Sequence, residues 1–287
     1  MARGIAIVVV VGCALTVPGP ALARPPVVVA AGDIACGGDP CKSQRRTARL
    51  IGRIDPRVVL PLGDIQYPDG ALHDFRSSYA PTWGRFKRRT FPTPGNHEYH
   101  TAHAAGYFAY FGARAHRSSG GNYAFELGRW HVLSINSGDG PPNDGTLRWV
   151  RRNLARNDDR CELAYWHHPR FSSGSRHGDH HGMRPLWEVL YRAGVDVALA
   201  GHEHNYERFG LLGPAGSKKA DGIRGFVVGT GGAALYPLPS HGMHGSQRRI
   251  DDHHGVLRLD LRRAGYEWRF VSVGRRVLDR GRQRCHT

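Results

Sequence analysis

Acidic, amide and imidazole side chains occur in this 287-residue sequence directly after short apolar segments with the composition of buried strands. In chain order the motifs read Gly32-Asp33, Gly63-Asp64-Ile65-Gln66-Tyr67, Gly95-Asn96-His97-Glu98, His167-His168-Pro169 and Gly201-His202-Glu203-His204-Asn205-Tyr206-Glu207-Arg208. A single Gly-Asp or Gly-Asn-His is more often a simple turn than a ligand. Because the carboxyl ends of strands in an α/β sheet gather at one edge, the five motifs together predict one site.

The side chains of these motifs predict a metal centre. They supply carboxylate, amide, imidazole and phenol groups without a thiolate, a set that suits Fe, Mn or Zn. Two Asp, one Asn, three His and one Tyr exceed the ligands of one ion that keeps open positions, so we expect a carboxylate that bridges two ions. Two ions about 3.5–4 Å apart can hold a hydroxide and polarise a phosphoryl oxygen. The chemistry that follows is hydrolysis of a phosphate ester.

The segment Gly201–Arg208 is the most informative of the five motifs. Its histidines, His202 and His204, are separated by one residue, and in an extended chain such side chains point the same way. We therefore expect both imidazoles to serve one metal centre.

The elements that must position these motifs alternate between strands and helices. Apolar, β-branched segments predict strands over Val27–Ala31, Val58–Leu62, Trp130–Ile135, Leu163–Trp166, Val195–Ala200, Phe226–Val228 and Val256–Leu261. Amphipathic spacing predicts helices over Ser43–Ile54, Thr146–Leu154 and Arg184–Ala193. This order defines the α/β class. Since no low-complexity linker interrupts it, we expect one catalytic domain over residues 24–287.

Residues 1–23 have the pattern of a secretory signal peptide. An apolar run from Gly4 to Val17 follows Arg3, and Ala21-Leu22-Ala23 offers a small-x-small cleavage site. The run is shorter than the ~20 residues of a transmembrane helix, and no later segment is apolar enough to span a bilayer. We expect a secreted protein, extracellular or associated with the cell envelope. Lipid attachment at Cys13 is the alternative.

Four cysteines remain after cleavage behind Ala23, and an export route would place them in an oxidising compartment. Of the three possible pairings we favour Cys36–Cys41 with Cys161–Cys285, because the first pair closes a short Gly/Pro loop.

The chain is strongly basic, with 40 Lys and Arg against 24 Asp and Glu. Such a surface attracts anions, although a general preference for arginine explains the charge equally well, and the nine arginines of Arg258–Arg284 fit a solvated face. A non-enzymatic protein that binds nucleic acid or an acidic cell surface is therefore one alternative. We still expect the basic surface to bind polyanions nonspecifically. The metal-binding motifs nevertheless favour an enzyme that acts on a phosphate ester. No obligate protein partner is predicted.

These motifs resemble those of the calcineurin-like metallophosphoesterase superfamily, and Tyr67 with Gly201–Arg208 is most similar to the purple acid phosphatases. The resemblance spans Val27 to Leu261 and implies a two-sheet α/β/β/α sandwich with a metal pair at the strand ends. The family's His-x-Pro order favours His167 over His168 as a ligand. The resemblance assigns Asp33, Tyr67 and His204 to the first ion, Asp64 to the bridge, and Asn96, His167 and His202 to the second.

The same resemblance implies cofactors and roles. A tyrosine ligand implies ferric iron, whose charge-transfer band colours the family purple, together with Zn, Mn or Fe(II). Coordinated water has a lowered pKa, so a metal-bound hydroxide would attack phosphorus. His97 resembles the histidine that contacts the phosphate and protonates the leaving alcohol. His177, ten residues after His167, matches a second substrate-site histidine, with His180 and His181 as alternatives.

The sequence departs from the family pattern at two points. Ala35 stands where the first motif, Asp-x-Gly, normally has glycine, and Arg24–Gly32 leaves no room for the amino-terminal β-domain of the large plant enzymes. We expect a compact domain whose cleft is shaped by residues 101–121 and 172–184. The predicted function is an exported, acid phosphatase-like phosphomonoesterase. A metal-dependent phosphodiesterase on nucleotides or phospholipid headgroups is the alternative.

Overall fold

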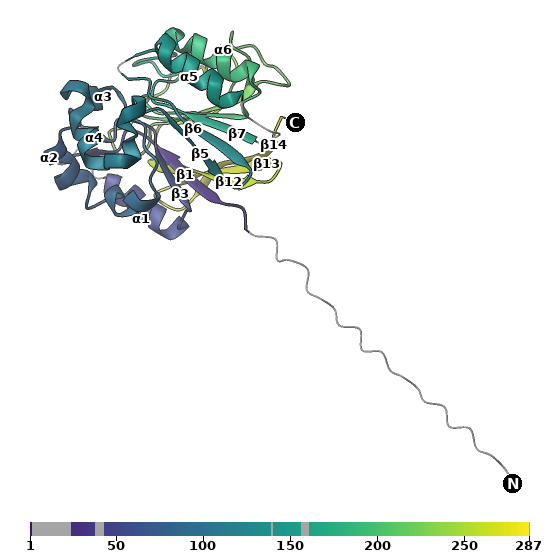
Figure 1. Cartoon of the computed structure of the whole chain (residues 1–287), viewed down its shortest axis with the longest axis horizontal. Coiled ribbons are helices and arrows are strands. Elements are labelled where there is room, and N and C mark those ends of the chain that lie inside the picture. The colour runs from purple at the N-terminus through teal and green to yellow at the C-terminus, as the bar shows by residue number, and fades with distance from the viewer. Residues whose placement is uncertain (2–23, 38–42, 139, 156–160, 287) are drawn as a thin grey trace.

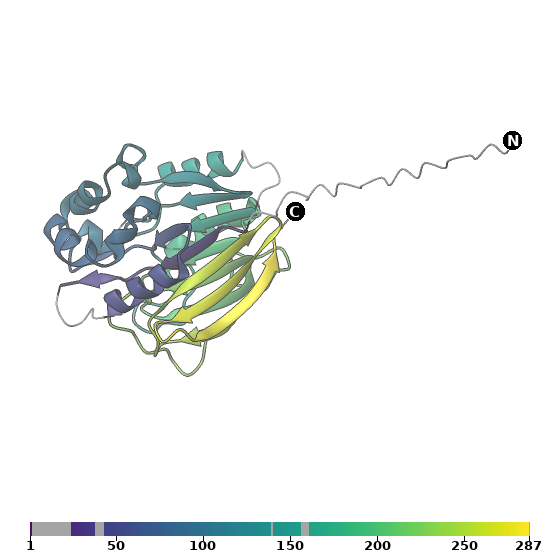
Figure 2. The same cartoon turned by 90° about the horizontal axis from the view of Figure 1, so that it is seen from below.

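Two β-sheets packed face to face form the centre of the protein, with helices on both outer sides (Figures 1 and 2). The computed structural model describes residues 1, 24–37, 43–138, 140–155 and 161–286. The first half contains strands β1 (Val27–Ala31), β2 (Ala35–Cys36), β3 (Val58–Pro61), β4 (Gln66–Tyr67), β5 (Tyr123–Leu127), β6 (Trp130–Ser134) and β7 (Cys161–Tyr165). The second half contains β8 (Val197–Ala200), β9 (Tyr206–Leu212), β10 (Ile223–Val228), β11 (Ser246–Ile250), β12 (Gly255–Arg262), β13 (Gly265–Ser272) and β14 (Val277–Arg284).

The helices are mostly short. The α-helices are α1 (Ser43–Ile54), α2 (Leu72–Asp74), α3 (Asn96–Tyr99), α4 (Ala105–Phe111), α5 (Asp144–Leu154) and α6 (Arg184–Arg192). Tighter or wider helical turns occupy η2 (Phe75–Tyr79), η3 (Trp83–Arg89), η4 (Ala102–Ala104), η5 (Gly112–Ala115), η6 (Arg117–Ser119) and η7 (His181–Met183).

The sheet topology brings the carboxyl ends of several strands together. One sheet has the order β14-β13-β12-β1-β3, the other β11-β9-β10-β8-β7-β6-β5, and β2 pairs with β4. β1 and β3 are parallel, and so are β7, β8 and β10 as successive neighbours. The amide of Gly32 donates to the carbonyl of Val228 at 2.8 Å, which joins the end of β1 to the end of β10. The loops after these strands therefore meet at one edge of the sandwich.

Two hydrophobic cores hold the layers together. One lies between the sheets and continues to the inner face of α1, where Ala48, Leu50 and Ile51 are buried. The other lies between the seven-stranded sheet and the helices α5 and α6, which cover its outer face (Figure 1). Each fully buried leucine or isoleucine contributes about 1.5–3 kcal/mol relative to an exposed one. The layer order confirms the predicted α/β/β/α sandwich.

Two carboxyl-terminal strands, β13 and β14, were not predicted. Arg258–Arg284 spans them and the end of β12, which overlaps the predicted strand Val256–Leu261. Most of its arginines are exposed, as expected, while Leu259, Trp268 and Phe270 are buried. In β13 buried and more exposed side chains alternate, so that one face is buried. β12 is largely buried on both faces, and β14 has exposed and half-buried side chains. The segment before Asn96 is not a regular strand in the described structure: Thr90 and Thr93 make only isolated bridges, to Val59 and Leu62.

A disulfide between Cys161 and Cys285 joins the start of β7 to the residue after β14, and therefore links the two sheets. This pairing was predicted and is confirmed. Cys41 lies outside the described residues, so the pairing Cys36–Cys41 stays a prediction, as does the signal peptide over residues 1–23. In the parts of the chain that the structure describes, no helix has the length and apolar character needed to cross a bilayer.

Beside this disulfide, Asp196 provides a pH prediction. Its carboxylate is 2 % exposed and accepts the amides of Glu162 and His286 at 2.8 and 2.6 Å. Burial raises the pKa of Asp196 to about 6 from 3.8. The native state therefore binds the proton more tightly, and its stability is full below pH 4 and falls as pH rises through 6. We expect this to lower the unfolding free energy on the order of 2 kcal/mol between pH 4 and 7.

Denaturant unfolding of wild type and Asp196→Asn across this pH range tests the assignment. The variant should gain stability relative to wild type as pH rises, because its amide cannot ionise. A stability difference that is the same at pH 4 and pH 7 would contradict the prediction.

Candidate metal centre

The two aspartates of the first two motifs are brought together by their own loops. The amide of Asp33 donates to the carbonyl of Gly63 at 3.1 Å, and that of Ile34 to Asp64 at 2.9 Å. Both aspartates are buried and have φ angles of 59° and 45°. Left-handed backbone in residues other than glycine is costly and persists where surrounding contacts impose it, as at functional sites.

The residues predicted to bind the first metal ion converge on the Tyr67 phenol. Its oxygen lies 3.0 Å from Asp33 Oδ1, 3.1 Å from Asp64 Oδ2 and 2.9 Å from His204 Nε2. Four donor atoms from three loops therefore converge in a volume that one cation could fill.

The residues predicted to bind the second metal ion converge on the His167 imidazole. Its Nε2 lies 3.1 Å from Asn96 Oδ1, 3.3 Å from Asp64 Oδ1 and 3.2 Å from His202 Nδ1. Asp64 thus turns one oxygen to each group, which is the geometry of a bridging carboxylate. The structure brings together all seven residues predicted as ligands.

Backbone carbonyls orient two of the imidazoles. Nδ1 of His167 donates to the Leu62 carbonyl at 2.8 Å, and Nδ1 of His204 donates to the Ala234 carbonyl at 2.6 Å. Because a carbonyl only accepts, the proton in each ring is at Nδ1. Nε2 is then the nitrogen that faces the centre and that would bind a metal ion once it has lost its own proton, the arrangement that metal-binding histidines adopt.

The expected extended geometry of His202 and His204 is wrong. Both lie in a bend before β9 begins at Tyr206, and His202 has a φ of 71°. A long-range contact accompanies this bend: the His202 amide donates to Asp33 Oδ2 at 2.9 Å, which joins the segment to the first loop. The two imidazoles consequently face different partners, His202 toward His167 and His204 toward Tyr67.

His168 lies beside the centre and faces a different partner. Its Nδ1 lies 3.1 Å from the Ser137 hydroxyl, and burial, followed by the charge of His167, lowers its pKa to about 3. Ligand atoms of His167, His168 and His202 all lie within 4.8 Å of one another. Only His167 of the adjacent pair contacts both Asn96 and Asp64 in the described structure, which favours it as the ligand.

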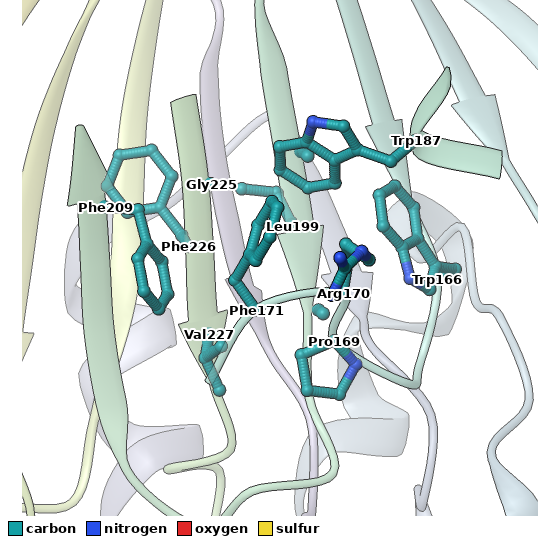
Figure 3. Close-up of a pocket in the computed structure, with 12 residues that line it drawn as sticks. Trp166, Pro169, Arg170, Phe171, Trp187, Leu199, Phe209, Gly225, Phe226 and Val227 are labelled. Atoms are coloured by element: carbon teal, nitrogen blue, oxygen red, sulfur yellow. The ribbon is translucent and has the colours of Figure 1, made fainter. Parts of the chain in front are cut away.

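Aromatic packing behind the His-His-Pro segment holds this pair in place (Figure 3). Trp166 Nε1 donates to the His168 carbonyl at 2.6 Å, and its ring meets Trp187 edge to face. Phe171 packs on Trp187 with ring centroids 4.9 Å apart. The space enclosed here is only about 10 Å³, so these residues form supporting core and not a ligand site.

The electrostatics of the centre fit bound cations. Burial, together with Asp33 and Asp64, raises the pKa of Tyr67 well above its ordinary value. Burial opposes ionisation of Asp64 as well, but His167 and His97 hold its pKa below the usual range. Buried carboxylates facing a phenol and several imidazoles need positive charge to offset them. The oxygen and nitrogen donors present are those that iron, zinc and manganese accept.

Both predicted catalytic histidines line a pocket of about 360 Å³ over this centre. His97 packs on the Tyr67 ring at 4.3 Å, with Nδ1 donating to the Pro68 carbonyl at 2.5 Å. The His177 ring lies 4.2 Å from that of His202. Of its predicted alternatives, His180 packs toward His168 and His181 has an 83 % exposed side chain.

Sequence reasoning missed two buried glutamates that fix the loops around these histidines. Glu98 accepts the amides of Ile65, Gln66 and Gly95 at 2.9, 3.0 and 2.7 Å, and burial raises its pKa to about 8. Glu203 accepts the amides of His177 and Gly178 at 2.6 and 2.9 Å. In the sequence Glu98 directly follows His97 and Glu203 directly follows His202. This position next to a predicted site histidine was the signal that could have identified the two glutamates.

The pocket walls also differ from expectation. Residues 172–184 contribute Arg176 and His177, as predicted, but residues 101–121 are absent from the described lining. Residues 233, 234 and 236 take that place, because the chain after β10 turns back over His204. Ala35 is accommodated: it is fully buried in β2, where its amide donates to the Ile65 carbonyl at 3.1 Å.

Gly95 has no room for a side chain. A methyl group on it would overlap the carboxylate and amide of Asp64 and lie 2.9 Å from His167 Cδ2. We expect Gly95→Ala to weaken metal binding by about 10–100-fold, the range seen when groups supporting ligands are disturbed. Elemental analysis after dialysis against buffered metal measures this. Gly274→Ala is the matched control, because its methyl would meet only ordinary van der Waals contacts. Equal metal binding by the two variants would contradict the prediction.

With this geometry described, comparison with known proteins defines the class. Residues 25–206 match the family of calcineurin-like phosphoesterases. The chain belongs to this family, in which a binuclear metal centre is typical, and the predicted resemblance is confirmed.

Comparison with individual curated proteins supports the same family. The chain is 30% identical over 255 residues to purple acid phosphatase 21 of Arabidopsis thaliana, covering 78% of this chain and 56% of that protein. It thus spans about half the length of the curated relatives it matches.

Two solved structures show the same fold. Purple acid phosphatase PPD1 from yellow lupin seeds is 18% identical, with a TM-score of 0.69 over 90% of this chain and 53% of that one. GAP50, the anchor in the inner membrane complex of Plasmodium, is 15% identical, with a TM-score of 0.65 over 92% of this chain and 90% of that one. Since the fold also serves an anchor, activity must be argued from the residues.

Proposed function

We propose that the protein is an exported, purple acid phosphatase-like phosphomonoesterase with Fe(III) and a divalent Zn, Mn or Fe ion. The observation that carries this proposal is the Tyr67 phenol oxygen, within 3.1 Å of Asp33, Asp64 and His204. A phenol among carboxylates and an imidazole is a donor set that favours a trivalent cation. The similarity to plant purple acid phosphatases supports the same assignment.

Two groups of residues would hold the ions. Asp33, Tyr67 and His204 would hold the ferric ion, Asn96, His167 and His202 the divalent ion, and Asp64 both. When bound, such a pair supplies a nucleophile at neutral or acidic pH and offsets negative charge on the phosphoryl group.

The protein's own side chains supply orientation and proton transfer. With Nδ1–H of His97 fixed on the Pro68 carbonyl, Nε2 faces Asp64 Oδ2 at 3.8 Å and is the atom that would give a proton to the leaving oxygen. His177, stacked near His202, would contact a phosphoryl oxygen from its place in the same pocket.

Hydrolysis of a chromogenic phosphomonoester and the matching phosphodiester by the purified, metal-loaded protein tests the proposal. Monoester turnover that disappears in Asn96→Ala would support it. Preferential diester turnover would favour the phosphodiesterase instead. A visible charge-transfer band that is lost in Tyr67→Phe, with two metal ions per wild-type chain, tests the iron assignment separately. Secretion into the culture medium, with residues 1–23 removed, tests export.

A further inference from the structure

A stack of side chains leads from the proposed metal centre into the pocket. The Tyr236 ring lies on the His204 imidazole with centroids 3.9 Å apart and planes inclined by 10°. The guanidinium carbon of Arg176 lies 4.4 Å from the centroid of the same Tyr236 ring. Arginine stacks on aromatic faces through its flat, delocalised cation, and stacking leaves its N–H groups at the edge free to donate.

Both members of the pair are fixed by the Gly201–Arg208 segment. Ser173 donates its amide and hydroxyl to buried Glu207 at 2.7 and 2.5 Å, and the amide of His177 donates to buried Glu203 at 2.6 Å. These bonds flank Arg176 on both sides. The amide of Tyr236 donates to the His204 carbonyl at 3.0 Å. The chain on either side of Arg176 and the backbone of Tyr236 are therefore anchored to the segment that carries the ligand histidines.

The charge of Arg176 faces the Tyr236 ring and is not neutralised by an acidic side chain in the described part of the chain. It is the one Lys or Arg among the described residues that line the pocket. No carboxylate of the described chain lies within ion-pair distance of its guanidinium. A guanidinium keeps its charge at all accessible pH values and binds carboxylate or phosphate through paired hydrogen bonds. Two ring layers separate it from the centre, so it lies too far out to replace a metal ligand.

We propose that Arg176, held on Tyr236, binds a second anionic group on the leaving alcohol of the substrate. The preferred substrates are then phosphomonoesters whose alcohol carries a carboxylate or another phosphate. This inference rests on the proposed phosphatase function and adds the class of substrate.

A matched pair of aryl phosphates tests the inference. 4-Carboxyphenyl phosphate and 4-carbamoylphenyl phosphate have nearly the same shape and differ in charge, and hydroquinone bisphosphate tests phosphate as the second anion. The quantity measured is the ratio of kcat/KM for each anionic substrate to that for the neutral one. Arg176→Ala should lower this ratio by about tenfold or more, mainly through KM, because a charge-assisted bond is lost. In Arg176→Lys this ratio should lie between those of the wild type and Arg176→Ala, since lysine keeps the charge but not the stacking geometry.

Arg282→Ala is the control, because it removes the same charge from an exposed position on β14 outside the pocket. A fall of the ratio in Arg176→Ala but not in Arg282→Ala supports the inference. Equal ratios in wild type and Arg176→Ala, with the neutral substrate turned over, would overturn it and leave the phosphatase proposal intact. A wild type that hydrolyses none of the substrates with metals loaded would overturn both. If Arg176→Ala lowers the kcat/KM ratio for 4-carboxyphenyl phosphate but not for hydroquinone bisphosphate, the inference holds with a carboxylate as the second anion.

Discussion

Asp64→Asn is expected to reduce phosphomonoester turnover by about a thousandfold or more, because the metals contribute several kcal/mol to catalysis and each 1.4 kcal/mol is a factor of ten. Asp64 is the side chain whose two oxygens face the two ligand groups, at 3.1 Å from Tyr67 and 3.3 Å from His167. Asparagine keeps the shape and tolerates the φ of 45° at this position, but it removes the charge that both ions would share.

Metal content and thermal stability separate this effect from misfolding. The wild type should gain melting temperature when metals are added, since ions that bind the folded state stabilise it, whereas Asp64→Asn should gain little. Asp69→Asn is the matched control: it lies just after β4, and its carboxylate accepts the Ala71 amide at 3.0 Å away from the pocket. Full metal content and near-normal turnover in Asp64→Asn would show that Asp64 is not a ligand.

The site residues that could be predicted from the sequence are those that directly follow a recognisable strand. A buried strand needs a continuous apolar run, so Val27–Ala31 was visible, and the residue that follows it is placed at the sheet edge by chain connectivity alone. The same logic located Asp64, His167 and His202. For these residues spacing along the chain and position in space are nearly equivalent.

The parts that it missed depend on contacts between distant segments. Glu203 sits between two predicted ligands, yet its role comes from the amides of His177 and Gly178, and no periodicity links these positions. Tyr236 reaches His204 because the chain after β10 turns back, and no motif marks that turn. The strand β13 was hidden because apolar and polar side chains largely alternate, and β14 was hidden because most of its side chains are polar, so neither contains a long apolar run. Their identity follows from pairing, which only the folded structure shows.

His97→Ala is expected to lower kcat by roughly 10²–10³-fold while metal content stays unchanged, the range in which loss of a positioned general acid falls. His97 lines the pocket through an imidazole whose Nδ1 is committed to the Pro68 carbonyl, so its Nε2 is the atom available for proton transfer. His100→Ala is a close control, because His100 also contacts the Pro68 carbonyl, at 3.3 Å, but does not line the described pocket.

The dependence on the leaving group distinguishes an acid from a structural residue. An alkyl alkoxide needs a proton to depart, whereas 4-nitrophenolate departs almost without one. The loss in His97→Ala should therefore be largest for an alkyl phosphate and smallest for 4-nitrophenyl phosphate. A loss that is equal for both leaving groups and accompanied by loss of metal would assign the His97 side chain to the support of Asp64, whose Oδ2 lies 3.8 Å from His97 Nε2. An equal loss with full metal content would make it a phosphate-binding group, because such a contact acts on the shared phosphoryl oxygens and not on the departing one.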